Sequence, residues 1–166
     1  MGKKWVGVIL VVLLVLGTVA IAFQNEPDGF RGLKWGDPPT EDMVYIDTNN
    51  NIKSYTRPGD KLGIGNAEFY ILEYDFYEGR FIGIFALFIN KDNYDILQTI
   101  CEEKFGKPTE RDYYELHWWG GEISLIHLEY DPIEENGCFI IESYQICLEK
   151  YKADKQKELE EAKEDF

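Results

Sequence analysis

The sequence has few of the residues on which enzymes most often depend. It contains two histidines and three cysteines among its 166 residues. None of its three serines, Ser54, Ser124 and Ser143, lies in the G-x-S-x-G turn that exposes a hydrolase nucleophile. No His-x-His or H-E-x-x-H spacing occurs, and strand alternation would place His117 and His127 on opposite faces of a sheet. The sequence therefore predicts no metal site and no recognisable catalytic residue.

Positive charge is also scarce. The chain has 17 Lys and Arg residues against 31 Asp and Glu residues, which gives a formal net charge of −14. Such a chain repels nucleic acid, and no basic patch offsets the repulsion, so we expect no nucleic-acid partner. The one glycine pair with loop-like spacing, Gly63-Ile64-Gly65, does not open a helix after a strand, so no nucleotide or other cofactor is expected.

Acidic residues are absent from the first 22 positions, which carry Lys3 and Lys4 instead. An uninterrupted apolar run, Trp5 to Phe23, follows them. As a helix rising ~1.5 Å per residue, this run matches the ~30 Å hydrocarbon core of a bilayer, and the positive-inside rule places the rest of the chain outside the cytoplasm. Two interpretations stay open. Cleavage after Ala22 would release a periplasmic or secreted protein, and an uncleaved segment would anchor it to the inner membrane through residues 5–23.

Composition divides the chain into four parts. The aromatic content of 15% and the length beyond the apolar run suit one domain with a real core. The polar, proline-containing stretch before this domain is typical of a linker, and the almost wholly charged end of the chain is typical of a solvated helix. The predicted parts are a signal anchor or cleavable signal peptide at 1–23, a linker at 24–29, an α+β domain at 30–152 and a charged helical tail at 153–166.

Alternating apolar and polar residues predict antiparallel hairpins. One is expected over 44–57, around an Asn-rich turn. A second joins 67–77 to 80–89 through Glu78-Gly79, where a two-residue loop would pair Phe76 with Phe81 and place Phe85 and Leu87 on the core face. A third joins 113–119 to 122–130 through Gly120-Gly121, and a last strand is expected over 138–142.

Three helices are predicted beyond the apolar run. Residues 92–105 carry apolar side chains at helical spacing, with Asp92 as the N-cap and Gly106 as the stop. Asp37 and Pro38 predict a short helix ending near Met43. A C-terminal helix is expected from Ser143. We therefore expect an α+β fold, with an antiparallel β-sheet of hairpins packed by one central helix, plus a C-terminal helix, preceded by an N-terminal hydrophobic helix.

The cysteines allow more than one redox state. Cysteines outside the cytoplasm tend to pair. Cys138 and Cys147 would be too far apart for a disulfide if a strand runs on into a helix between them. Cys101 paired with either of them, and three free thiols, both stay open.

Aromatic residues provide the candidate for binding. Trp118 and Trp119 directly precede the predicted Gly-Gly turn, and their side chains point to opposite faces of the sheet. The expected register places Trp118 in the core. Trp119 would then be exposed together with Tyr113 and His117, and an exposed Trp near a hairpin tip can anchor a partner. These three residues are the predicted partner-binding surface.

Three segments together suggest a resemblance. They are FRGLKWG at 30–36, FYEGRF at 76–81 and CEEKFGKP at 101–108. The chain resembles a group of small uncharacterised exported bacterial proteins across most of residues 30–150. The resemblance implies a bacterial cell envelope location and an α+β domain. It carries over no catalytic residue.

The sequence thus favours a non-catalytic module, facing the cell envelope, that binds an unknown protein or an envelope ligand. Two alternatives stay open. One is a structural subunit of a membrane complex, for which the apolar run would remain uncleaved. The other is a small envelope hydrolase that uses carboxylates, because acidic residues are too numerous for the sequence to exclude a working pair.

Overall fold

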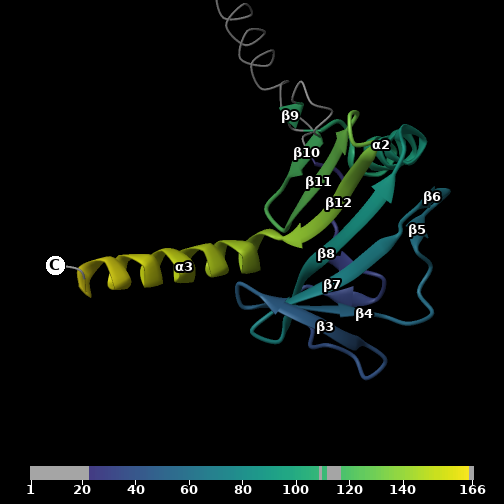
Figure 1. The fold of residues 1–166 in the computed structure, drawn as a ribbon. Coiled ribbons are helices and arrows are strands. Elements are labelled where there is room, and N and C mark those ends of the chain that lie inside the picture. The colour runs from purple at the N-terminus through teal and green to yellow at the C-terminus, as the bar shows by residue number, and fades with distance from the viewer. Residues whose placement is uncertain (1–22, 109, 112–116, 165–166) are drawn as a thin grey trace, which may run out of the picture.

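The computed structural model describes residues 23–108, 110–111 and 117–164 (Figure 1). The predicted N-terminal helix and the predicted cleavage site after Ala22 lie outside these residues. None of the helices that the structure describes is both long enough and apolar enough to span a bilayer.

The described chain folds as α+β, as predicted. Its largest part is an eight-stranded antiparallel sheet in the order β3-β4-β7-β8-β12-β11-β10-β9. Two small antiparallel pairs, β1–β2 and β5–β6, lie apart from it. In chain order the elements are β1 Gly29–Phe30, β2 Leu33–Lys34, β3 Val44–Asn49, β4 Ile52–Thr56, β5 Gly63–Ile64, β6 Ala67–Glu68, β7 Ile71–Tyr77, β8 Arg80–Ile89, α2 Lys91–Phe105, β9 Glu110–Arg111, β10 His117–Gly120, β11 Ser124–Asp131, β12 Asn136–Ser143 and α3 Tyr144–Glu164.

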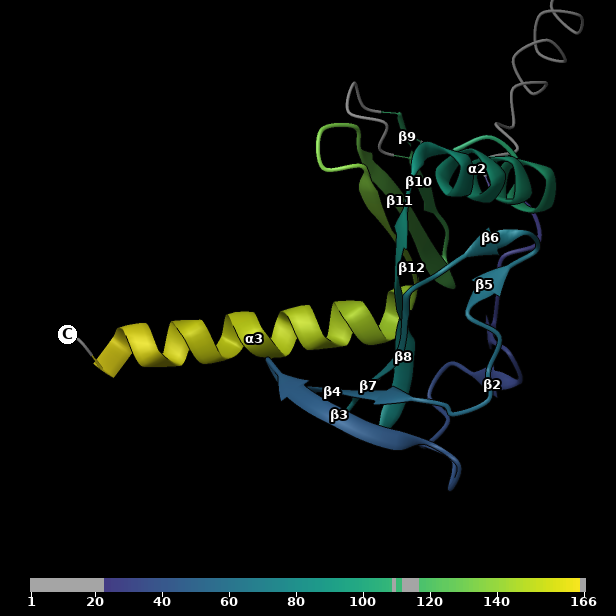
Figure 2. The same ribbon diagram turned by 45° about the vertical axis from the view of Figure 1, so that its right-hand side comes forward.

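The sheet has one covered face and one more open face. Figure 2 views β8 nearly edge-on and shows α2 on one side of the sheet, with α3 leaving on the other. We call the face toward α2 the inner face and the opposite one the outer face. Aromatic and aliphatic side chains fill the inner face, and the largest that are fully buried are Trp119, Tyr74, Phe76, Phe81 and Phe88, with Tyr94 packed on them from α2.

The β7–β8 hairpin turns at Glu78-Gly79, as predicted. Both residues have positive φ, 51° and 76°, which suits the tight turn of a two-residue loop. Phe76 pairs with Phe81, but a β-bulge follows, and Asp75 then pairs with Gly83. The extra residue, Ile82, reverses the alternation of β8 beyond it. Residues 84, 86 and 88 consequently lie on the inner face, and the prediction that Phe85 and Leu87 face the core was wrong.

The β10–β11 hairpin also differs from the predicted register. His117 pairs with Leu128 rather than Ser124, and the loop extends over residues 121–123. The Glu26 carboxylate accepts hydrogen bonds from the backbone N–H groups of Ile123 and Ser124, at 3.0 and 3.3 Å. This contact from the start of the domain accounts for the longer loop, because it satisfies loop N–H groups that strand pairing would otherwise use.

The central helix α2 begins one residue earlier than predicted. Its N-cap is Asn90, not Asp92, and the Asn90 side chain accepts a hydrogen bond from the Asn93 N–H at 3.1 Å. The helix ends at Gly106, as predicted. Between Asp37 and Met43 no helix forms, because the Asp37 carboxylate accepts the Lys34 N–H at 2.8 Å and so closes a turn instead of capping a helix.

The C-terminal helix α3 runs without a break across the predicted domain boundary at residue 152. Ile146, near its start, packs against Tyr77 and Ile82. Tyr144 and Tyr151 of the same helix are 39% and 60% exposed. Figure 1 shows α3 projecting away from the rest of the domain. Ion pairs three and four residues apart, such as Lys150–Asp154 at 2.6 Å, support this exposed helix.

The stretch 24–29, predicted as a linker, makes several hydrogen bonds with the domain. Gln24 N–H donates to the Phe105 carbonyl, and the Asn25 side chain donates to the Lys104 carbonyl, both at 2.8 Å. These bonds satisfy carbonyls at the C-terminal end of α2, where intrahelical partners are missing.

Candidate functional site

The predicted partner-binding surface is not an exposed row. The Trp119 side chain is 0% exposed, and its Nε1 donates to the Gly106 carbonyl at 2.8 Å. His117 is also buried and lies beside Tyr94 of α2. The expectation that Trp119 and His117 are exposed was wrong, because the observed register turns both of them toward α2. Tyr113 lies outside the described residues.

Trp118 takes the place that was predicted for Trp119. It lies on the outer face, where its ring packs edge-on against His127 with centroids 5.7 Å apart. Trp118 is therefore not a core residue, and the prediction that placed it in the core was wrong. His117 and His127 lie on opposite faces of the sheet, as predicted.

A cavity of about 390 Å³ lies between α2, the sheet and the two small hairpins. Its volume is within the usual range for small-molecule sites. The wall is mostly apolar. Leu97, Ile100 and Phe105 come from α2, Phe139 and Ile141 come from β12, and Phe30 and Ile64 come from β1 and β5. We call this space the α2 cavity.

Close approach of the β5–β6 hairpin to α2 depends on Gly65. This residue has φ +59°, and a Cβ added to it would lie 2.8 Å from the Cδ1 atom of Ile100. A larger residue would be strained at this φ, and the end of the Ile100 side chain would have to move aside. Gly65 thus holds one wall of the cavity close to the helix.

Among the residues that the structure describes, three cationic side chains and no acidic one line the α2 cavity. Arg31 donates to the Gly63 carbonyl at 2.7 Å and pairs with Asp60 at 3.3 Å. Lys61 donates to the Gly65 carbonyl. Lys104 forms no ion pair with any residue that the structure describes, and its ammonium lies 5.3 Å from the centre of the Phe105 ring. The site is therefore apolar inside and positive at its edge.

Cys101 also lines the cavity but is not a nucleophile. Burial raises the pKa of its thiol to about 12, and the charge of Lys104 opposes this shift only in part. At neutral pH the residue is a small apolar wall group. All three cysteines are free thiols, and the sheet separates Cys101 on its inner side from Cys138 and Cys147 on its outer side.

The outer face carries a row of polar groups across four strands. Ser54, Asp75, Gly83 and Glu142 are successive cross-strand partners. The Ser54 hydroxyl donates to Asp75 at 2.6 Å. Burial raises the pKa of Asp75 to about 6 against this hydrogen bond, and the charge of Glu142 adds to the shift. Burial also raises the pKa of Glu142, against a hydrogen bond with Cys147. Since Gly83 has no side chain, nothing from β8 separates the two carboxyl groups.

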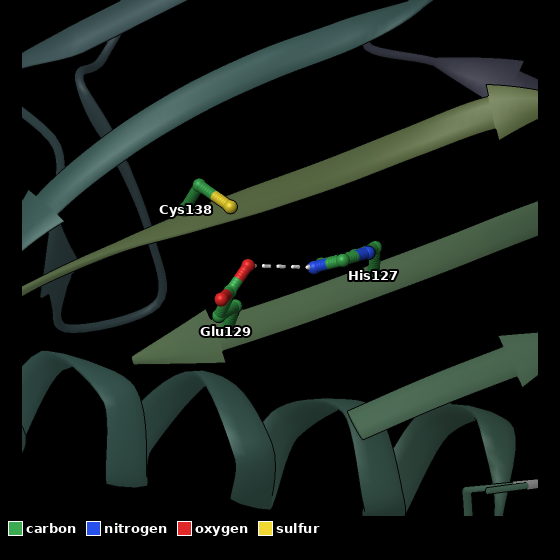
Figure 3. A group of neighbouring side chains, drawn as sticks. All are labelled: His127, Glu129 and Cys138. Carbon is green, nitrogen blue, oxygen red and sulfur yellow. Dashed lines mark hydrogen bonds and ion pairs between the residues drawn. The ribbon is translucent and has the colours of Figure 1, made fainter. Parts of the chain in front are cut away.

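Further along the outer face, His127, Glu129 and Cys138 lie together (Figure 3). The donor atoms of the three side chains all lie within 4.8 Å of one another. His127 Nε2 is 3.2 Å from a Glu129 oxygen. Among the residues that the structure describes, this is the group of side chains that could hold a metal ion. The sequence offered no signal for it, because Cys138 is brought in by strand pairing and not by a local spacing.

Comparison with known proteins does not indicate a function for these sites. No protein-family model matches the chain, and neither the curated proteins nor the solved structures contain a match. The resemblance to small exported bacterial proteins therefore stays a prediction. The α2 cavity, the carboxyl row and the His-Glu-Cys group are the features from which a function can be argued.

Proposed function

We propose that the protein is a non-catalytic binding module of the cell envelope, and that its ligand is a small amphipathic anion held in the α2 cavity. The observation that carries the proposal is the contrast between the cavity and the whole chain. In a chain of net charge −14, the described part of the chain lines an apolar cavity of about 390 Å³ with three cations and no acid.

The two parts of the cavity would recognise two parts of the ligand. An aliphatic body would be stabilised by leaving water, by about 0.8 kcal/mol for each buried CH₂ group. A carboxylate or phosphate head at the edge would form charge-assisted hydrogen bonds, which are stronger than neutral ones. Positive charge at the edge also favours an anion over a cation of the same shape.

Lys104 is the best candidate to bind the head group. Arg31 is already paired with Asp60, and Lys61 already donates to a backbone carbonyl. The Lys104 side chain is exposed at the rim and forms no ion pair with a described residue, so it can turn toward a ligand without breaking one.

Titration calorimetry with octanoate tests this proposal. The full-length chain would be held in phosphatidylcholine nanodiscs, with empty nanodiscs as the blank for partitioning. We expect Lys104→Glu to weaken octanoate binding at least tenfold. Lys107→Glu makes the same charge change on an exposed residue outside the cavity wall, and it should alter binding less than twofold.

Two further measurements sharpen the test. Octanol, which lacks the charge, should bind both variants and the natural chain equally. Ile100→Trp should abolish binding of octanoate and octanol alike, because the larger side chain fills the cavity. Equal losses for Lys104→Glu and Lys107→Glu would show only a long-range charge effect and would contradict the proposal.

The envelope location is part of the proposal and rests on the Trp5–Phe23 run. Intact mass spectrometry of soluble and membrane fractions tests it. A soluble species beginning at Phe23 would indicate a cleaved signal, and a full-length species in the membrane would indicate an anchor. Membrane retention with a cross-linked neighbour, and no octanoate binding, would favour a structural subunit instead. A full-length species in the soluble fraction would contradict the location.

One observation favours the hydrolase as a second candidate. Asp75 and Glu142 lie in one row with only Gly83 between them, and the raised pKa of Asp75, about 6, suits a general acid. The test is a panel of nitrophenyl glycosides and esters. Turnover that disappears in both Asp75→Asn and Glu142→Gln would support hydrolysis, and no turnover by the natural chain would exclude it for these substrates.

A further inference from the structure

We propose that His127, Glu129 and Cys138 form a binding site for one Zn²⁺-type transition-metal ion on the outer face of the sheet. The site lies on β11 and β12 (Figure 3). Its side chains alternate along these strands with the inner-face residues, so it is on the opposite side of the sheet from the α2 cavity. It is therefore independent of the proposed anion ligand and extends the function of the protein.

Strand geometry brings the three ligands together. His127 and Glu129 are two residues apart on β11, so their side chains point to the same face. Cys138 on β12 is the direct cross-strand partner of Glu129, which places its thiol over the same spot. Each ligand thus sits on a sheet strand and not on a loop, and sites on such rigid elements hold their geometry well.

The distances approach those of a tetrahedral centre. Zinc bonds of ~2.0–2.3 Å require neighbouring ligand atoms to be about 3.3–3.8 Å apart. His127 Nε2 and the Glu129 oxygen are already 3.2 Å apart. All separations within the group are at most 4.8 Å, so a side-chain rotation that moves the sulfur by about 1 Å would complete three corners. The fourth corner would be left to water or to a ligand from a partner.

The donor set selects the class of metal. One imidazole nitrogen, one carboxylate oxygen and one sulfur suit Zn²⁺ and its probe ion Co²⁺, whereas Mg²⁺ and Ca²⁺ prefer oxygen ligands alone. Cys138 would bind as a thiolate after its proton passes to the solvent. The Trp118 ring, edge-on to His127, helps to hold the imidazole in place. The chain's net charge of −14 favours the approach of a cation.

Titration of the full-length chain with Co²⁺ in nanodiscs tests the site. A 1:1 complex should show a thiolate-to-cobalt charge-transfer band together with the intense visible bands of tetrahedral Co²⁺. Zn²⁺ should displace the cobalt, and a hundredfold excess of Ca²⁺ should not. Absence of these bands in the natural chain, or displacement by Ca²⁺ as effective as by Zn²⁺, would overturn the proposal.

Variants assign the ligands. Cys138→Ser should remove the charge-transfer band and weaken Zn²⁺ binding at least tenfold, whereas Cys147→Ser removes the other outer-side thiol and should change neither. Glu129→Gln, at a side chain that is 52% exposed, should weaken Zn²⁺ binding without unfolding the domain. If Cys138→Ser fails to fold, Glu129→Gln and the cysteine control still decide the matter. A band lost in Cys147→Ser, or unchanged affinity in Glu129→Gln, would contradict the assignment.

Discussion

The two faces of the eight-stranded sheet are built from the same strands but differ in almost every property. Along β11, buried Ile126 and Leu128 alternate with His127 and Glu129, which face outward. The inner residues pack under α2, while neither of the described helices lies flat over the outer ones in either ribbon view (Figures 1 and 2). Along this strand, one set of alternate residues packs in the core, and the other set presents polar side chains that can bind a ligand.

Ionisation is the clearest mark of this difference. On the outer face, burial raises the pKa values of Glu73, Asp75, Glu142 and Cys138. A half-buried carboxylate costs stability, because the folded protein solvates its charge less well than water does. Groups kept at such a cost are more often found at functional sites, whereas the aromatic and aliphatic inner face contributes mainly to stability outside the α2 cavity.

The largest expected change in the free energy of unfolding comes from replacing Trp119, and Trp118 provides the comparison. Trp119→Ala removes a fully buried ring and its hydrogen bond, and it should lower the free energy of unfolding by about 3–5 kcal/mol. Trp118→Ala, one residue away on the outer face, should cost about 1 kcal/mol or less. Urea denaturation measures both values. Similar losses for the two variants would mean that the outer face is packed as tightly as the inner one.

A smaller effect, of opposite sign, is expected at Asp75. Its pKa is about 6 in the folded protein against 3.8 ordinarily, so the folded state holds the proton more tightly than the unfolded state does. Stability should therefore fall as pH rises from about 4 to 6 and stay lower above that. Asp75→Asn avoids this loss and keeps an acceptor for Ser54, so it should raise the free energy of unfolding at pH 7 by about 1–3 kcal/mol.

The control for Asp75→Asn is to measure its stability gain at low pH as well as at pH 7. The gain from Asp75→Asn should disappear at pH 4 and below, where the natural side chain is already protonated in the folded state. Glu103→Gln makes the same charge change on an exposed part of α2 and should alter stability by less than ~0.5 kcal/mol at either pH. A gain from Asp75→Asn that persisted at low pH would show that packing, not ionisation, is responsible.

The smallest expected change in stability concerns the N-cap of α2, the helix that covers the inner face. Asn90 caps α2 and has φ 65°, a conformation that asparagine and glycine tolerate better than alanine does. Asn90→Ala should cost about 1–2 kcal/mol, and Asn90→Gly only a few tenths. Thermal unfolding of the two variants measures this order. A reversed order would mean that the side-chain cap matters more than the backbone conformation.

Much of the fold could be predicted from local signals. Glu78-Gly79 marked the β7–β8 turn, and the spacing of Tyr94, Leu97, Cys101 and Phe105 marked the face of α2 that is buried. These elements depend on neighbouring residues, which the sequence displays directly.

The candidate sites depended on contacts between distant residues and were missed. The inner position of Trp119 follows from a loop that Glu26 contacts from 97 residues away. The bulge at Ile82 reversed the alternation of β8, and only the neighbouring Gly83 marked it in the sequence. Arg31, Lys61 and Lys104 meet at one cavity only because two small hairpins close over α2. Such pairings are set by tertiary packing, and alternation alone does not determine a register.

The hydrogen bonds of Gln24 and Asn25 have a mechanical consequence. They attach the point where the chain enters the domain to the last turn of α2, the turn that carries Lys104. Whatever fixes the direction of the chain at Phe23 therefore also fixes the direction in which the cavity edge faces. If residues 5–23 are embedded in a bilayer, the rim would open beside the membrane surface, and an amphipathic anion leaving that surface would travel only a short way to reach it.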